Sequence, residues 1–557
     1  MTLRLRTLVS LLAHAFRPAS SSPPLAPAHA RGLLRGAACA MLLLCPLGGA
    51  AAQEPQKMAV AGVRVEGNTL LPEHTVRALT ADLAGSQRSL DELNAAAARV
   101  QQAYRDAGYG GVVVFIPPQQ SGDGQIVMRV VEGKLANVRV TGNEHFDTAN
   151  VRAGLPHLRE GTTPLVRAID RDIQLANDNP AKHLKVTLAA GARSGEIDAS
   201  VDVTDVDPLQ YLVGYNNTGT PLTGRHRLSL GVQHANLFGR DHVGTLQFQT
   251  SPEDPDKVKI FSASYRVPLY AQAASVDAYV AHSSVSIATA IATLGTLAFT
   301  GKGTMAGVRL NRYLDRLGEY DHQVTLGLDW RDYEDTCSFG DFGRDQCGTA
   351  AVDVTTIPLS IAYVGQKQGA ELAYGVNLSA SVNAGGSARN TYEAARIGGK
   401  RHYAITRMTA FAERRLSSIL SLNGRLELQY SPHRLISAER YGVGGVNSVR
   451  GYREREASGD LGLLARIELA ATVPNLADKL RVQPYLFIDH GRVRNHGDLA
   501  CGVGTSTTCS LSSVGIGTRF GWNRRLSASL DLGRALRQGS ATAKGDVRGH
   551  VAVNLAF

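Results

Sequence analysis

The sequence predicts two small α+β modules followed by an all-β domain of sixteen antiparallel strands that closes into a transmembrane barrel. Three observations support this prediction: a short motif that occurs twice, a long C-terminal region in which apolar and polar side chains alternate, and an N-terminal segment typical of exported proteins. No run of eighteen apolar residues follows that segment, so a membrane-spanning helix is not expected. If the chain enters a membrane it must therefore cross as a closed barrel, which leaves no backbone polar group unpaired.

Residues 1–52 have the composition of a signal peptide. Arg31 and Arg35 precede the apolar stretch AACAMLLLCPLGGAAA, which ends in small residues before the polar QEPQK. We expect cleavage before Gln53; because the segment is long, either the signal is extended or the true start lies further in. Without its five arginines the formal charge falls from +10 to +5, and no Lys/Arg stripe is interleaved with aromatic residues. Nucleic acid is therefore not an expected partner.

The motif VRVEGNTLL at residues 63–71 returns as VRVTGNEHF at 138–146. Such internal similarity, at a spacing of 75 residues, predicts two copies of one small domain, at 59–134 and 135–206. Each copy opens with an alternating strand that turns at Gly-Asn and continues into helical sequence.

In the first copy, four apolar side chains fall on one helical face: Leu93, Ala97, Val100 and Tyr104. Strands follow at 112–116 and 125–133. The second copy is more compressed, with a helix near 164–176 and then the strands KHLKVTL and EIDASVDVT. Both copies are therefore predicted to have the order β-α-α-β-β.

This order, with AYRDAGY on the second helix and VVEG at the end of the first copy, resembles the POTRA domain, a periplasmic polypeptide-binding module. The resemblance implies no catalytic residue, because such a module binds by offering the open edge of its sheet to an extended client strand. The candidate client-binding edges are Val112, Val113, Val114, Phe115 and Ile116 in the first copy, and Leu184, Lys185, Val186, Thr187 and Leu188 in the second. The alternative is that both modules are structural spacers.

The region 209–557 alternates apolar and polar side chains. In QVTLGLDW, for example, Leu326, Leu328 and Trp330 lie opposite Gly327 and Asp329. This pattern also fits a half-buried soluble sheet. The number and length of the strands distinguish such a sheet from a transmembrane barrel. Sixteen segments are long enough for the ~9–11 tilted residues that cross a bilayer. They are 209–217, 225–237, 242–250, 256–268, 272–283, 301–313, 319–332, 351–364, 370–383, 400–414, 421–434, 459–473, 480–494, 511–522, 525–536 and 547–557.

The connectors between these segments alternate in length. FGRD, RYLDRLG and WNRR are short, whereas the intervening connectors are mostly longer and richer in Gly, Ser and Asp, as in outer-membrane barrels. The last strand ends at Phe557, and a terminal aromatic in this pattern resembles the signal that the barrel assembly machinery recognises.

The predicted mature chain holds two close cysteine pairs, Cys337 with Cys347 and Cys501 with Cys509. Both lie in long connectors on the same predicted side of the barrel. Neither pair is Cys-x-x-Cys, and no histidine lies at a metal-ligand interval, so neither a metal nor another cofactor is expected. Two loop disulfides in an oxidising compartment are the better interpretation.

The sequence NSVRGYRE, residues 447–454, places Arg450 in the long connector after the eleventh strand. On its own this arginine could be an ordinary solvated charge. However, two POTRA-like modules before a sixteen-strand barrel, with VRGY in this loop, resemble the two-partner secretion transporters, the TpsB family that includes ShlB, FhaC and HecB. The segments YNNTGTPLTGRHR at 215–227 and FIDHG at 487–491 resemble two further segments of that family.

In LFIDHG, Leu486 and Ile488 are suited to lipid, which turns Phe487 and Asp489 into the lumen. An intramembrane carboxylate is costly unless it is paired, and an arginine fork is its best partner. The resemblance implies that Arg450 supplies this partner from inside the barrel. The predicted loop lock consists of Val449, Arg450, Gly451, Tyr452, Phe487, Asp489 and Gly491.

The resemblance implies an outer-membrane translocator that exports a partner exoprotein of the haemolysin or adhesin kind. Its POTRA domains lie in the periplasm, and its expected partners are the TpsA-type client, the lipid bilayer and the barrel assembly machinery; the chain is expected to be monomeric. Family members often begin with a helix that plugs the barrel, but only about six residues separate the expected cleavage site from the first module. A plug helix is therefore not expected, unless the signal is misread and cleavage lies further upstream.

The sequence leaves two alternative functions open. Related POTRA-barrel proteins of the BamA/TamA kind insert other barrels, so an assembly factor is the alternative. An outer-membrane enzyme is less consistent with the sequence, which has no Gly-x-Ser-x-Gly and no His-Glu-x-x-His motif.

Overall fold

The computed structural model describes residues 57–557 apart from 121, 222, 286–287, 293–294, 300–301, 335–351, 478, 503–504 and 524. The expected signal peptide and the Cys337–Cys347 pair lie outside the described residues. In the part of the chain that is described, no helix is both long and apolar enough to span a membrane.

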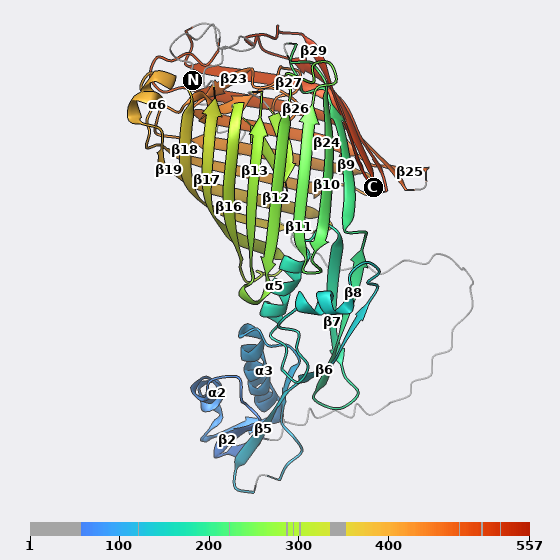
Figure 1. Cartoon of the computed structure of the whole chain (residues 1–557). Coiled ribbons are helices and arrows are strands. Elements are labelled where there is room, and N and C mark those ends of the chain that lie inside the picture. The colour runs from blue at the N-terminus through green and yellow to red at the C-terminus, as the bar shows by residue number, and fades with distance from the viewer. Residues whose placement is uncertain are drawn as a thin grey trace, which may run out of the picture. The chain divides into compact units, whose positions relative to one another are not determined.

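The first module contains a three-stranded sheet, a two-stranded sheet and two α-helices (Figure 1). Strand β5 is central in the order β2-β5-β4, parallel to β2 and antiparallel to β4, and β1 pairs with β3. The elements are β1 (Lys57–Val60), β2 (Gly62–Glu66), α2 (Glu73–Thr80), η1 (Ala81–Leu83), β3 (Ser86–Ser89), α3 (Leu90–Asp106), β4 (Val112–Phe115) and β5 (Gln125–Glu132).

Helix α3 packs onto this sheet through its apolar face. The four side chains that the sequence placed on that face are buried, together with Ala96. The helix begins with a capping box, in which Ser89 and Glu92 satisfy each other's backbone N–H groups. The cap fixes where the helix starts, and the periodicity fixes which face packs on the sheet.

The second module repeats this arrangement in shorter form. Its sheet has the order β6-β8-β7, with β8 parallel to β6 and antiparallel to β7. The elements are β6 (Lys134–Thr141), α4 (Thr148–Ala153), α5 (Val166–Ala176), β7 (Lys182–Ala190) and β8 (Glu196–Asp205). The second module therefore has the predicted order β-α-α-β-β, whereas the first has two additional strands, β1 before this order and β3 between its two helices.

The Gly-Asn motif of the first module is held by a carboxylate at the end of its last strand. Asn68 donates its side-chain amide to the carbonyl of Leu71 at 2.9 Å, and Glu132 accepts the backbone N–H of Thr69 at 2.7 Å. Burial alone would raise the pKa of Glu132, but the hydrogen bonds from Thr69 and Tyr104 outweigh burial, so that the pKa is lowered.

The second module has the same device. Asn143 donates to the carbonyl of Phe146 at 2.8 Å, and Asp205, the last residue of β8, accepts the backbone N–H of Phe146 at 2.9 Å. The repeated motif thus encodes a turn that joins the first strand of each module to the end of the last one.

The C-terminal region forms the predicted barrel of sixteen strands, in which β24 and β25 are successive parts of one strand (Figure 1). Each strand pairs antiparallel with its neighbours, and β29 closes onto β9. The strands are β9 (Leu209–Asn216), β10 (Arg227–Leu237), β11 (His242–Thr250), β12 (Ile260–Leu269), β13 (Ala274–Ser283), β16 (Lys302–Tyr313), β17 (Tyr320–Glu334), β18 (Val354–Lys367), β19 (Leu372–Gly386), β20 (Ala404–Arg415), β21 (Leu420–Tyr430), β24 (Leu461–Ala471) with β25 (Val473–Ala477), β26 (Leu480–Arg494), β27 (Thr508–Trp522), β28 (Leu526–Ala535) and β29 (Val547–Ala556).

The connectors contain further short elements: η2 (Tyr270–Gln272), a hairpin of β14 (Ala288–Ala292) and β15 (Gly295–Phe299), helix α6 (Arg389–Ala395), η5 (Ser437–Glu439), and a hairpin of β22 (Tyr441–Val443) and β23 (Ala457–Gly459). Apart from η2, all of them lie in the long connectors.

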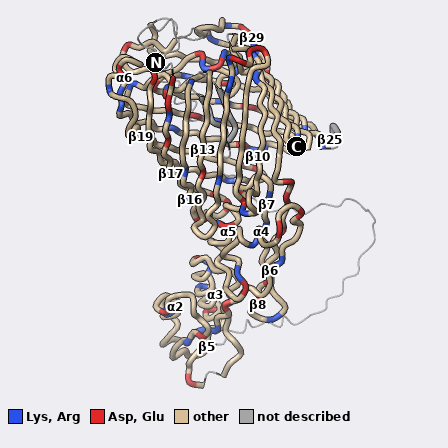
Figure 2. The backbone as a smooth tube through the Cα atoms, viewed as in Figure 1, with Lys and Arg blue, Asp and Glu red and all other residues tan. Residues whose placement is uncertain are grey.

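The two faces of the barrel wall differ as the alternation predicts. On β26, Leu486 and Ile488 are each 58% exposed on the outer face, whereas Phe487 is 3% and Asp489 0% exposed on the inner face. In Figure 2, uncharged residues predominate along the barrel strands. An apolar outer surface and a polar lumen are what a lipid-embedded barrel requires.

The barrel closes at its last residue. Tyr211 and Phe557 exchange two backbone hydrogen bonds, of 2.7 and 3.1 Å, and their rings lie 6.0 Å apart. The terminal aromatic residue therefore pairs with the start of β9, where the barrel follows the second module.

A buried ion pair joins the second module to the turn between β10 and β11. Lys182 of β7 contacts Asp241 at 2.5 Å and donates to Asn150 at 2.9 Å. Both charged side chains are almost fully buried, and Tyr270 donates to Asp241 at 2.6 Å. Burial lowers the pKa of Lys182, although Asp241 opposes this shift.

The carboxylate that holds the first Gly-Asn turn provides a test of the fold. We expect Glu132→Ala to destabilise the first module by about 1–3 kcal/mol, because the N–H groups of Thr69 and Leu70 lose their acceptor. Since the folded-state pKa of Glu132 is lowered, its contribution is present above the unfolded-state pKa and is lost as the pH falls through the folded-state value. Hydrogen exchange of the module's amides in the full chain, at neutral and acidic pH, measures both effects.

The matched control is Glu73→Ala, which removes an exposed carboxylate that forms an i,i+4 ion pair with Arg77. We expect its effect to stay below about 0.5 kcal/mol. Equal exchange rates in the two variants at neutral pH would contradict the assigned role of Glu132.

Candidate functional site

The longest described connector is residues 431–460, between β21 and β24, which we call the inner loop. Its arms form the hairpin of β22 and β23, and its tip carries the VRGY sequence. Arg450, at the tip, is 1% exposed. It is therefore not the solvated charge that a surface loop would carry.

The guanidinium of Arg450 forms a two-pronged ion pair with Asp489 of β26. Nε lies 2.8 Å from one carboxylate oxygen and Nη2 2.8 Å from the other. The backbone N–H of Arg450 also donates to Asp489, at 3.1 Å. Three hydrogen bonds thus fix both the side chain and the backbone of the loop tip against one wall residue.

The remaining guanidinium nitrogen, Nη1, binds two further carboxylates. It lies 2.8 Å from Glu468 of β24 and 2.9 Å from Asp531 of β28. Two more wall arginines complete the cluster, with Arg519 2.5 Å from Glu468 and Arg466 3.5 Å from Asp489. Three guanidinium groups therefore face three carboxylates, so that the formal charges of this arginine cluster cancel.

Aromatic rings cover the arginine cluster. The guanidinium carbon of Arg450 lies 3.5 Å from the ring centroid of Phe487, and that of Arg519 lies 4.1 Å from the centroid of Tyr485. Tyr485 also donates its hydroxyl to Asp531 at 2.7 Å. Stacking on a ring and exclusion of water both strengthen the attraction between the guanidinium and the aromatic face.

The two large uncharged residues of VRGY anchor the loop by packing. Val449 and Tyr452 are fully buried in one apolar cluster with residues of both the loop and the wall. The hydroxyl of Tyr452 lies 2.9 Å from the carbonyl oxygens of Ser512 and Arg537. It thus links the loop tip to the connector that follows β28.

Glycines allow the loop and the wall to approach closely. Gly451 has φ +88°, a left-handed conformation that favours glycine, and a Cβ there would lie 2.8 Å from the carbonyl oxygen of Gly533 on β28. On β26, a Cβ at Gly491 would lie 2.7 Å from Val449. All seven residues predicted for the loop lock therefore come together at one site.

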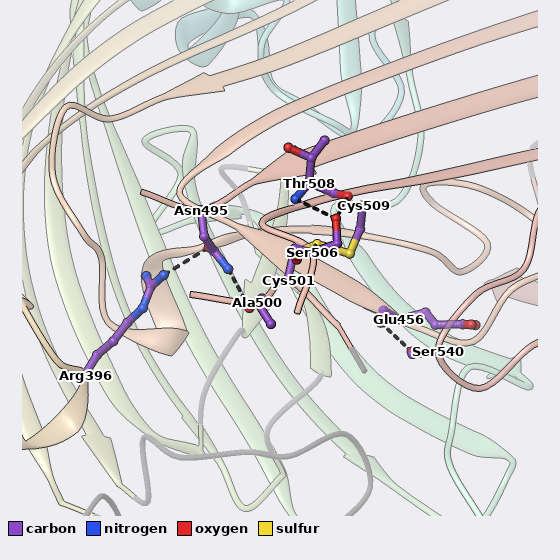
Figure 3. The surroundings of a disulfide bond; sticks show 9 residues. All are labelled: Arg396, Glu456, Asn495, Ala500, Cys501, Ser506, Thr508, Cys509 and Ser540. Atoms are coloured by element: carbon purple, nitrogen blue, oxygen red, sulfur yellow. Dashed lines mark hydrogen bonds between the residues drawn. A yellow bond between two sulfur atoms is a disulfide. The ribbon is translucent and has the colours of Figure 1, made fainter. Parts of the chain in front are cut away.

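A disulfide joins Cys501 and Cys509 beside this site (Figure 3). Cys501 belongs to the same apolar cluster as Val449 and Tyr452, and its carbonyl accepts the N–H of Ser458 in the inner loop at 3.4 Å. Figure 3 also shows Asn495 donating to the carbonyl of Ala500 at 2.8 Å. The crosslinked connector thus forms part of the support for the loop.

The candidate client-binding strands are outer strands of their sheets, but part of each edge is already occupied. On β4 the N–H of Val114 donates to the side chain of Gln101 at 3.3 Å. On β7 the side chain of Asn177 binds both backbone groups of Leu184, at 2.6 and 3.0 Å. By strand alternation, the backbone groups of Val186 and Leu188 point to the same outer side as those of Leu184.

Sequence reasoning missed several residues of the arginine cluster: Arg466, Glu468, Arg519 and Asp531. Each is an inward-facing charge in a strand that otherwise alternates, and this was the available signal. Among the described residues, no group of three or more His, Cys, Asp or Glu side chains could hold a metal ion.

The fold and the site define a class of protein: an outer-membrane barrel preceded by small α+β modules, with an arginine-bearing loop folded into its lumen. The family model for the haemolysin secretion/activation protein ShlB/FhaC/HecB matches residues 195–520, and that for the ShlB-type POTRA domain matches residues 58–133. The chain belongs to the ShlB/FhaC/HecB family of haemolysin secretion/activation proteins. It is thus a two-partner secretion transporter, not an enzyme, that exports a partner protein across the outer membrane.

Individual relatives agree with this assignment. The heme/hemopexin transporter protein HuxB of Haemophilus influenzae is 24% identical over 464 residues, covering 78% of this chain and 75% of that protein. The outer membrane transporter CdiB of Dickeya dadantii is 23% identical over 489 residues, covering 85% and 81%. The structure of CdiB from Escherichia coli shares the fold, with a TM-score of 0.74 at 19% identity over 91% of this chain and 92% of that one.

A conservative substitution tests the geometry of the arginine cluster. We expect Arg450→Lys to speed hydrogen exchange of the amides at 444–456 at least about tenfold, because one ammonium cannot replace a fork that reaches three carboxylates. Hydrogen exchange with mass spectrometry on the detergent-solubilised protein provides the measurement. Arg492→Lys, an exposed position on β26, is the matched control and should leave these amides unchanged. Native-like protection in the Arg450 variant would show that charge alone holds the loop tip.

Proposed function

We propose that the modules capture the client in an extended form and that the barrel passes it outward when the inner loop leaves the lumen. The client is a large secreted exoprotein of the TpsA type. The observation that carries this proposal is the burial of Arg450 among three carboxylates of the wall, at the tip of a loop inside the lumen. A loop held there by a few specific contacts can close the channel at rest and still be released.

Capture is assigned to the outer strands β4 and β7. An outer strand presents a row of backbone donors and acceptors that pairs with any extended segment, so that the client sequence matters little. On β4, Val113 is 51% and Phe115 39% exposed, which adds apolar contacts beside the edge. We assign the second module to the POTRA type as well, because it repeats both the strand order and the Gly-Asn turn of the first.

The locking role of Arg450 follows from the energetics of buried charge. A buried ion pair adds little net stability, because desolvation offsets the attraction, but removing one partner is costly. The arginine cluster therefore selects one loop position without making it permanent.

Phe557, which is 63% exposed at the barrel end, is assigned as the residue that the barrel assembly machinery recognises.

Secretion by the Arg450→Ala strain tests the lock. We expect the barrel to insert normally and export to fall at least about tenfold, because a loop without its anchor moves within the lumen and obstructs the client. The measurement is the amount of client in the medium, with a strain lacking this chain as the zero reference. The proteins that this strain fails to release identify the client, and an intact outer-membrane profile distinguishes a dedicated transporter from an assembly factor. Arg492→Ala is the control, and undiminished export by the Arg450 variant would refute the lock.

Photocrosslinking tests the capture edges. We expect a photoreactive residue at Val113 or Lys185 to crosslink the client during export, because both side chains are exposed on the proposed edge strands. The same residue at Glu73, an exposed position on helix α2, is the control. Equal crosslinking from all three positions would mean that the client does not select the edges, and the modules would then be spacers.

A further inference from the structure

We propose that Glu439 is a second positioning residue of the inner loop, which anchors the base of the loop to strands β17 and β20 of the barrel wall. Glu439 is the last residue of η5, just before the first arm of the loop hairpin, and it is 2% exposed. This inference rests on the proposed role of the inner loop in closing the channel.

Glu439 is bound by three side chains of the barrel wall. Oε1 lies 2.8 Å from Arg331 and accepts the hydroxyl of Tyr333 at 3.1 Å, both on β17. Oε2 lies 3.5 Å from Arg407 on β20. This loop carboxylate is therefore held by donors from two strands, as the loop arginine is held by carboxylates from three.

One of these wall residues, Arg331, is itself held by a neighbouring carboxylate of the wall. Arg331 lies 2.7 Å from Asp329. That carboxylate also binds Arg309 of β16 and accepts the hydroxyl of Tyr279 of β13 at 2.8 Å. The donors that face Glu439 are therefore preorganised by neighbouring strands. We call the set of Glu439, Arg331, Tyr333, Arg407 and Asp329 the glutamate cluster.

The backbone around Glu439 is anchored as well. Gln429 of β21 donates to the carbonyl oxygens of Glu439 at 3.1 Å and of Asp460 at 3.4 Å. Asp460, at the other end of the inner loop, pairs with Arg396 of α6. Both ends of the loop thus meet at one wall position.

The two clusters share no residue and lie on different parts of the wall. In the barrel order, the glutamate cluster draws on β17 and β20, whereas the carboxylates that hold Arg450 come from β24, β26 and β28. The segment from Glu439 to Arg450 therefore runs between two separate sectors of the wall. The arginine cluster fixes its tip and the glutamate cluster fixes its base.

Two tethers on one loop act together. When one tether opens, the other keeps the loop near its site, so that the first contact re-forms easily. Full withdrawal of the loop therefore requires release of both clusters. Glu439 controls loop position independently of Arg450, and the two contributions should multiply in the open-to-closed ratio of the channel.

The experiment compares Glu439→Gln, Arg450→Ala and the double variant with the unmodified full-length protein. Glu413→Gln is the matched control, because Glu413 is an exposed glutamate on β20 outside the cluster. Hydrogen exchange reports the base of the loop, residues 435–443, and its tip, residues 444–456. Ion conductance in planar bilayers reports the open-to-closed ratio. We expect Glu439→Gln to speed exchange at the base at least about tenfold, and the double variant to raise the open-to-closed ratio by about the product of the single effects.

The outcomes separate the two locks. Two independent anchors predict that Glu439→Gln speeds exchange of the amides at the loop base and leaves exchange at the tip slow. They predict the reverse for Arg450→Ala. If Glu439→Gln matches Glu413→Gln in both exchange and conductance, Glu439 is not an anchor, whatever Arg450 does. If Arg450→Ala leaves export unchanged while Glu439→Gln still speeds exchange at the loop base, the proposed lock at Arg450 fails and the anchor at Glu439 stands.

A second variant covers the case in which Glu439→Gln does not fold. Arg331→Lys keeps a positive charge beside Asp329 but cannot bridge Asp329 and Glu439 as a fork does. We expect it to free the loop base in a barrel that still inserts. Unchanged exchange at 435–443 in this variant would overturn the proposal.

Discussion

The structure depends on one constraint: a guanidinium removed from bulk water must be surrounded by carboxylates that cannot follow it if it moves. The three carboxylates around Arg450 come from β24, β26 and β28, so the arginine cluster forms only when these strands have their correct register. On β26 the pairing places Asp489 opposite Arg466 and Phe487 opposite Glu468. The register of these strands and the position of the loop are therefore set by the same contacts.

Close packing of backbone on backbone supports this arrangement. Gly451 and Gly533 let the loop tip touch the wall, and on β27 Gly515 lies where a Cβ would meet the ring of Phe487 at 2.4 Å. Small residues in the wall thus create the space in which the large side chains of VRGY and FIDHG are buried. The inner loop therefore packs closely against the lumen wall at this site.

Much of this fold could be predicted from the sequence because barrel strands have a strict two-residue period, and a slip of one residue would turn every side chain to the wrong face. The predicted 242–250 and 480–494 strands coincide with β11 and β26. Asp489 was predicted from the resemblance of FIDHG to a family motif, and its cost as an unpaired intramembrane carboxylate supported that assignment. Glu439 and the edge contacts of Gln101 and Asn177 were missed, because a single polar residue in a loop or helix carries no periodicity and its partner lies far away in sequence.

The same residues explain how the transporter can be closed and yet release its loop. Desolvation offsets most of the attraction within each cluster, so each anchor contributes specificity more than stability. In the proposed mechanism, a client that enters the lumen brings its own polar groups and replaces Arg450 or Glu439 as the partner of the wall charges. Under the same proposal, an extended client strand would replace the side-chain contacts of Gln101 and Asn177 at the module edges by a row of backbone hydrogen bonds. At both stages the proposal has the client replace contacts within the protein by equivalent ones, so that transport would proceed without exposing unpaired charges or edges.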